Sequence, residues 1–278
     1  MRVLPGCRFF FFDCETSVMR AQHHFLISVF TVLALSGPAI VQFSDARLWL
    51  FPIAAGFGAL LPDADGGDAA VFHAKIKGTS RFVGRRLARF IDDFFGTINF
   101  VFLGFFGKYL LCLPYRFLVG AKARHRGVFH SVYAGLFSSV VVSSILSVIV
   151  ISFSSPTFDP LTIAFFFVGF FSGFFLHLLE DACTASGIDF LAPFCSFFLR
   201  GNHGTDSGNQ LLPDAMTYAL LLLAVAPFAL TLASAPAVNY VSPIPYWEAQ
   251  GGLVAAVVAV WALFLFLFGV RKGGGVRS

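Results

Sequence analysis

Residues 161–189 read LTIAFFFVGFFSGFFLHLLEDACTASGID, a long apolar run that ends in a group of ionisable side chains. Residues 161–179 are almost entirely apolar, and a helix needs about 20 such residues to cross the hydrocarbon core of a bilayer. His177 and Asp181 follow at the end of this run, four residues apart, so they share one face of a helix. The stretch therefore predicts a membrane helix with a polar site at its carboxyl end.

The whole chain has the composition of a membrane protein. Hydrophobic residues make up 57% of its 278 residues and charged residues only 12%, with a mean hydropathy of +0.80. A soluble domain carries about 25% charged residues, roughly twice this share. This balance excludes an ordinary cytosolic enzyme, a disordered chain and a basic nucleic-acid-binding domain, so no nucleic-acid partner is expected.

Other apolar runs extend the prediction to a bundle. Two stretches are ambiguous: residues 48–61 are short and contain Pro and Gly, and residues 94–113 are interrupted by three glycines and Lys108. We expect an all-α, polytopic membrane helix bundle with about five to seven membrane segments. The four runs that join 161–179 as spanning helices are 25–43, 128–153, 215–235 and 251–270.

Lys and Arg predict the orientation of the chain. They are concentrated in residues 62–93, in residues 114–127 and in the tail after Val270, whereas residues 154–160 and 236–250 contain neither. Cytoplasmic loops carry an excess of Lys and Arg, so the basic segments and the C-terminus are expected in the cytoplasm. The stretch between the two internal basic segments should then enter the bilayer and return, or lie at its interface.

Ionisable residues beside membrane segments are costly to keep and are often functional. Taken alone, Asp63 and Asp65 also fit the role of turn or cap residues. Taken alone, His125 also fits the role of an interfacial side chain. In the predicted topology, however, all of these ionisable residues lie at the cytoplasmic ends of their helices. They form four patches: MRAQHH at 19–24, LLPDADGGD at 60–68, HRGVFHS at 125–131 and HLLEDACTASGID at 177–189.

A bundle would bring these patches to one shallow pocket, and bundle interiors are a usual place for metal sites. Several carboxylates placed together repel one another unless a divalent cation neutralises them. The five cysteines show no CxxC pair, so imidazole nitrogen and carboxylate oxygen are the expected donors. That donor set favours zinc, although manganese and iron also fit.

The motifs LLPDAD, HRGVFHS and HLLEDACTASGIDFLAPF, in this order between apolar helices, resemble the YdjM family of membrane-bound metal-dependent hydrolases. That family is distantly similar to the zinc-dependent phospholipase C and P1 nuclease superfamily. One departure is Gly66-Gly67-Asp68, where family members often carry His-Pro. The resemblance implies a metal and catalytic set of His24, Asp63, Asp65, His125, His130, His177 and Asp181.

The resemblance covers about residues 19–210 and therefore divides the chain. Residues 1–18 are expected to be an extension, with Met19 a natural start. Residues 19–210 would form the hydrolase-like membrane domain. Residues 211–278 would add two C-terminal transmembrane helices and a basic tail.

The leading functional hypothesis is metal-assisted hydrolysis of a phosphoester, in a lipid or lipid-linked substrate, at the cytoplasmic face of the inner membrane. Asp63 or His125 would act as general base or orient a ligand, and Arg126 would hold a phosphate oxygen. Alternatives are a non-enzymatic metal-binding sensor or carrier, and a purely structural role for the His and Asp residues. The expected metal ligands are His24, Asp65, His130, His177 and Asp181.

Overall fold

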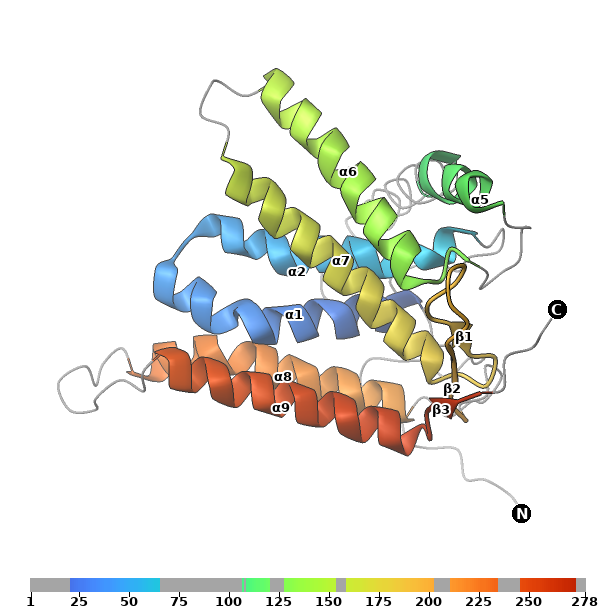
Figure 1. Cartoon of the computed structure of the whole chain (residues 1–278). Helices are drawn as coiled ribbons and strands as arrows, with labels where there is room; N and C mark the ends of the chain where they lie inside the picture. Colours follow the sequence, from blue (N-terminus) through green and yellow to red (C-terminus); the bar gives the residue numbers. More distant parts are fainter. Residues whose placement is uncertain are drawn as a thin grey trace, which may run out of the picture.

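The computed structural model describes residues 21–65, 107, 109–120, 128–153, 159–202, 211–234 and 246–273. Five helices in these residues are long and apolar enough to cross a membrane, which confirms the predicted all-α polytopic bundle (Figure 1). Each contains or closely matches one of the apolar runs predicted from the sequence. They are α1 (Ala21–Phe43), α6 (Val132–Phe153), α7 (Pro160–Ala182), α8 (Leu211–Ser234) and α9 (Tyr246–Leu267).

The ambiguous stretch 48–61 forms a short helix inside the bundle. After α1 the chain makes a 3-10 turn, η1 (Ala46–Trp49), then α2 (Leu50–Leu60) and a second 3-10 turn, η2 (Pro62–Asp65). The 11 residues of α2 extend only about 16 Å, roughly half the thickness of a hydrocarbon core. Helix α2 packs against both α1 and α7.

Helices α2 and α7 are in backbone contact. A Cβ atom on Gly173 would lie 1.9 Å from the carbonyl oxygen of Ala55, and one on Gly58 would lie 2.0 Å from that of Phe170. Only glycine permits this approach, and small residues at helix contacts are typical of membrane bundles. The contact holds the carboxyl end of α2 against the last turns of α7.

Helix α1 lies between α2 and α7 on one side and α8 and α9 on the other (Figure 1). Trp261 Nε1 of α9 donates to Thr31 Oγ1 of α1 at 3.2 Å. His23 Nε2 lies 2.9 Å from Asp214 Oδ1 in the first turn of α8. Helix α6 packs on α7. Polar contacts thus join α1 to the two C-terminal helices.

A small antiparallel sheet, absent from the sequence-based expectation, lies beyond the end of α7. Its strands are β1 (Ile188–Asp189), β2 (Phe198–Arg200) and β3 (Arg271–Lys272), in the order β1-β2-β3. Strand β3 lies just after α9 and pairs with β2. The segment that follows α9 is therefore joined to the segment that follows α7. Asn202 N also donates to the carbonyl oxygen of Phe268 at 2.8 Å.

The stretch 94–113, expected to be re-entrant or interfacial, lies largely outside the described residues. Its described end, residues 109–112, is helical and continues into α5 (Leu113–Val119). Helix α5 ends at Gly120, whose φ of +63° is the left-handed conformation that glycine favours at a helix end. Leu111 and Tyr115 are buried in the core that also contains Phe129 and Phe174.

Candidate metal centre

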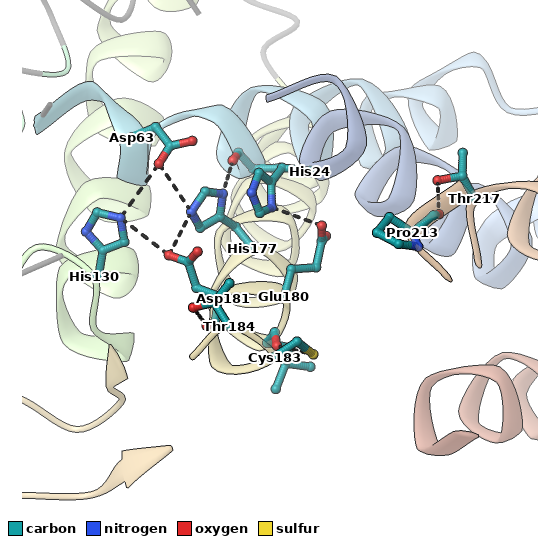
Figure 2. Close-up of polar contacts among 12 residues, drawn as sticks. His24, Asp63, His130, His177, Glu180, Asp181, Cys183, Thr184, Pro213 and Thr217 are labelled. Carbon is teal, nitrogen blue, oxygen red and sulfur yellow. Dashed lines mark hydrogen bonds and ion pairs between the residues drawn. The ribbon is translucent and has the colours of Figure 1, made fainter. Parts of the chain in front are cut away.

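Four elements place ionisable side chains at one end of the bundle (Figure 2). His24 lies in the first turn of α1, and Asp63 lies in η2 just after α2. His130 lies two residues before α6 begins. His177 and Asp181 lie in the last two turns of α7. The gathering at a common end follows from the alternating directions of the helices.

Two imidazole nitrogens and two carboxylate oxygens surround one small space. Asp181 Oδ2 lies 3.4 Å from His177 Nε2 and 3.6 Å from His130 Nε2. Asp63 Oδ1 lies 3.8 Å from each of the same two nitrogens. All four distances exceed the 2.7–3.2 Å that is usual for an N–H···O hydrogen bond. The side chains point at one another without closing the space between them.

This spacing fits a metal ion. Nitrogen and oxygen ligands bind zinc at about 2.0–2.2 Å, so two ligands at the tetrahedral angle lie about 3.4 Å apart. The observed separations of 3.4–3.8 Å are close to that value. Among the described residues, none makes a hydrogen bond to the buried Nε2 of His177.

His24 extends the site. The ligand atoms of His24, His177 and Asp181 lie within 4.8 Å of one another, as do those of Asp63, His130 and His177. The two groups share His177. The arrangement therefore accommodates one ion held by a subset of these residues, or two neighbouring ions.

The site is buried and opens on one side. His130 and His177 are fully buried and Asp181 is 1% exposed, whereas the Asp63 side chain is 25% exposed. Asp63 therefore lies at the mouth of the site. Among the described residues of the site, this carboxylate is the one most open to water.

Hydrogen bonds to the backbone orient the ring of His177. Its Nδ1 lies 2.7 Å from the carbonyl oxygen of Ala59, and because a carbonyl can only accept, Nδ1 carries the proton. In the neutral ring the lone pair is then on Nε2, the atom that faces the two carboxylates. A histidine held through its other nitrogen in this way is the usual arrangement of a metal ligand. The close packing of α2 on α7 supplies the carbonyl.

The electrostatics of Asp63 favour its charged form. Burial raises the pKa of this carboxyl, but the nearby histidines, His177 before His130 and His24, together lower it well below its usual range. Asp63 is therefore a carboxylate at neutral pH. With Asp181 and the fully buried Glu180, three acidic side chains lie close to three histidines. Carboxylate crowding of this kind is relieved by a divalent cation.

Glu180 is a contact that the sequence analysis missed. Its Oε2 lies 2.9 Å from His24 Nδ1, and both side chains are almost fully buried. The ring of His24 also packs on that of His177, with 4.1 Å between the centroids. The only signal in the sequence was the acid directly before Asp181. Nothing in the sequence showed that it would face α1.

The structure brings together five of the eight predicted site residues. Asp63, which was assigned to proton transfer or orientation, lies inside the group of candidate ligands. Asp65 ends η2, but its side chain lies outside the described residues, as do His125 and Arg126 entirely. The residues brought together are His24, Asp63, His130, His177 and Asp181.

Comparison with known proteins places the chain in a family. The family model described as YdjM inner membrane protein matches residues 19–273, a range that includes the candidate metal centre together with α8, α9 and β3. No curated protein and no solved structure gives a significant match. Since the family model covers most of its length, this chain belongs to the YdjM inner membrane protein family.

Proposed function

We propose that this protein is a metal-dependent hydrolase that cleaves a phosphoester in a membrane lipid or lipid-linked substrate. The observation that carries the proposal is a pair of imidazole nitrogens, each 3.4–3.8 Å from the same two carboxylate oxygens, at the common end of the membrane helices. The spacing suits a metal, and the position at the helix ends suits a substrate whose phosphate lies at the headgroup level.

The residues that would hold the metal are His130, His177, Asp63 and Asp181, with His24 beside them. A bound divalent metal supplies a water of lowered pKa and polarises a phosphoryl oxygen. Asp63 lies within a group of candidate ligand atoms together with His130 and His177, which supports a ligand role for it rather than that of general base. His125 remains the candidate base, and Arg126 the candidate phosphate contact.

Zinc is the proposed metal because the donors are imidazoles and carboxylates. The thiol nearest in sequence, Cys183, does not add to them: its Sγ donates to the carbonyl oxygen of Leu179 at 3.4 Å. Burial raises the pKa of this thiol far above its usual range, and the nearby Glu180 and Asp181 raise it further. A protonated thiol is a poor zinc ligand.

The proposed location of the site is the cytoplasmic face of the inner membrane. The family name supports the inner membrane. The Lys- and Arg-rich segments flank the site end of the helices in sequence, which supports the cytoplasmic face.

One observation favours a second candidate, a non-enzymatic metal-binding sensor. His130, His177 and Asp181 are at most 1% exposed, which is the burial of a structural metal site. A carrier is less well supported, because carriers bind their ions near the bilayer midplane and this site lies at the helix ends.

Purification in mild detergent, followed by zinc reconstitution and elemental analysis, tests the proposal. The wild type should retain zinc, His177→Ala should not, and Asp159→Asn at the start of α7 is a matched control that should. Hydrolysis of a panel of phospholipids and lipid-linked phosphates should then follow zinc content. Zinc binding without cleavage of any member of the panel would favour the sensor, and a wild type that binds no metal would remove both candidates.

A further inference from the structure

An apolar groove lies on the membrane-embedded part of the bundle, between α1, α2 and α7. It has a volume of about 530 Å³ and is open on one side. Two of its hydroxyls are turned to protein partners, since Thr31 accepts from Trp261 and Ser36 donates to the carbonyl oxygen of Val32. Its walls include Thr31, Leu35, Ala39, Ser172, Phe175 and Leu176.

The groove lies within the candidate membrane spans. Its α1 wall, residues 31–39, belongs to the span His23–Phe43, and its α7 wall, residues 168–176, belongs to the span Pro160–Ala182. Eight helical steps of 1.5 Å give each wall a length of about 12 Å. The open side therefore faces hydrocarbon rather than water.

The groove lies next to the candidate metal centre along α1 and α7. Leu176 in its wall directly precedes His177 and lies one helical turn, about 6 Å, before Glu180. Thr31 lies two turns, about 10 Å, after His24. The buried contact between His24 and Glu180 therefore separates the end of the groove from the metal ligands.

We propose that this groove binds one hydrocarbon chain, acyl or prenyl, of the lipid whose headgroup reaches the metal centre. The inference rests on the proposed function in taking that lipid as the substrate. Apolar walls in a hydrocarbon environment hold hydrocarbon, because water there would lack hydrogen-bond partners.

Photo-crosslinking tests the groove directly. The full-length protein in detergent is mixed with phosphatidylglycerol that carries a diazirine in one acyl chain, irradiated, and the labelled peptides are identified by mass spectrometry. The groove-filling variants are Ala39→Leu and Ser172→Leu. Their matched controls, Ala259→Leu and Ser144→Leu, add the same side chains at exposed positions of α9 and α6.

Labelling should concentrate on residues 31–39 and 168–176. It should fall about tenfold in each groove-filling variant and stay unchanged in both controls. A tenfold loss is expected when two methylene groups of the lipid chain are no longer buried. The melting temperature in detergent serves as the folding control, and it should remain close to the wild-type value in the groove-filling variants.

Labelling that spreads evenly over the exposed faces of α6 and α9, unchanged by Ala39→Leu and Ser172→Leu, would overturn the proposal. A separate bifunctional reagent that joined two copies of the chain at the groove would overturn it as well. The labelling needs neither metal nor turnover, so the two proposals fail separately. If the groove is labelled but the protein binds no metal, only the hydrolase proposal fails. If the protein hydrolyses a lipid but the groove is not labelled, only the proposal of a chain-binding groove fails.

Discussion

His24 Nδ1 lies 2.9 Å from Glu180 Oε2, in a contact where the two side chains are 3% and 0% exposed. The contact joins the beginning of α1 to the end of α7, through two residues that lie 156 positions apart in the sequence. It also fixes the ring of His24 against the ring of His177. Glu180 thus positions a candidate ligand without itself belonging to the candidate ligand groups.

Replacing Glu180 should therefore weaken zinc binding without removing a ligand. We expect Glu180→Ala to lower zinc affinity by about 10–100-fold, the range found for groups that orient a metal ligand. Glu180→Gln keeps an acceptor oxygen for His24 and should lose much less. Competition with a chromophoric chelator measures both. Equal affinity for wild type and Glu180→Ala would show that the contact has no part in metal binding.

The neighbouring histidines His23 and His24 offer a matched pair. Helix geometry turns them to different partners, His23 to Asp214 on α8 and His24 to α7. His24→Ala should lower the zinc affinity at least as much as the about 10–100-fold expected for an orienting group. His23→Ala should keep zinc at the wild-type stoichiometry. Elemental analysis after dialysis distinguishes them, and zinc loss in both variants would contradict separate roles.

Packing between α2 and α7 should control the metal centre from a distance. An added methyl at Gly173 meets the Ala55 carbonyl, so Gly173→Ala must push the two helices apart and carry Asp63 and the Ala59 carbonyl away from His177. We expect a loss of about 1–3 kcal/mol of stability and weaker zinc binding. Thermal unfolding in detergent measures the loss of stability.

Gly252→Ala is the control for this substitution, because a Cβ atom there meets nothing within 4 Å. Alanine is the better helix former, so this variant should be as stable as the wild type or slightly more so. An unchanged melting temperature in Gly173→Ala would mean that α2 and α7 can separate without cost.

Asp45 should make the far end of the bundle sensitive to acid. Hydrogen bonds from the Arg47 side chain and backbone lower the pKa of this carboxyl, which also caps η1, and Arg47 contacts Asp159 at the start of α7. A pKa lowered by folding stabilises the protein above the unfolded value of about 3.9, and this stability is lost as pH falls through the folded pKa.

The melting temperature should therefore fall more steeply below about pH 4 in the wild type than in Asp45→Asn, which has no carboxylate to protonate. At neutral pH the variant should be the less stable of the two. Parallel pH profiles for the two proteins would rule out this contribution. The carboxylates of the metal centre are present in both proteins, so their titration cancels in the comparison.

The spans and the common site end were predictable because both depend on local sequence. Run length predicts a crossing, and the spacing of His177 and Asp181 places both on one face of α7. Rotation about each helix axis was not predictable. Helices α1 and α6 are mostly apolar with scattered polar residues, so neither has a distinct polar face that shows which side points inward. The contact of His24 with Glu180 depends on that rotation.

The short strands were missed for a different reason. A strand of two or three residues carries no periodic pattern, and β3 forms only because the end of α9 lies beside the loop after α7. Helix α2 was ambiguous because its glycines read as interruptions. Gly58 is instead a position at which α7 makes backbone contact, and Gly56 lies against the ring of Phe25 on α1.

The pairing of β2 with β3 gives the last helix a mechanical connection to the metal centre. Leu199 pairs with Lys272, Gly201 N donates to the Thr184 carbonyl, and Thr184 Oγ1 donates to the Asp181 carbonyl at 2.7 Å. A change of tilt in α9, such as a thinner or thicker bilayer imposes, is therefore transmitted through a short series of hydrogen bonds to a candidate ligand. The lipid composition of the membrane thereby becomes a variable of the site's geometry.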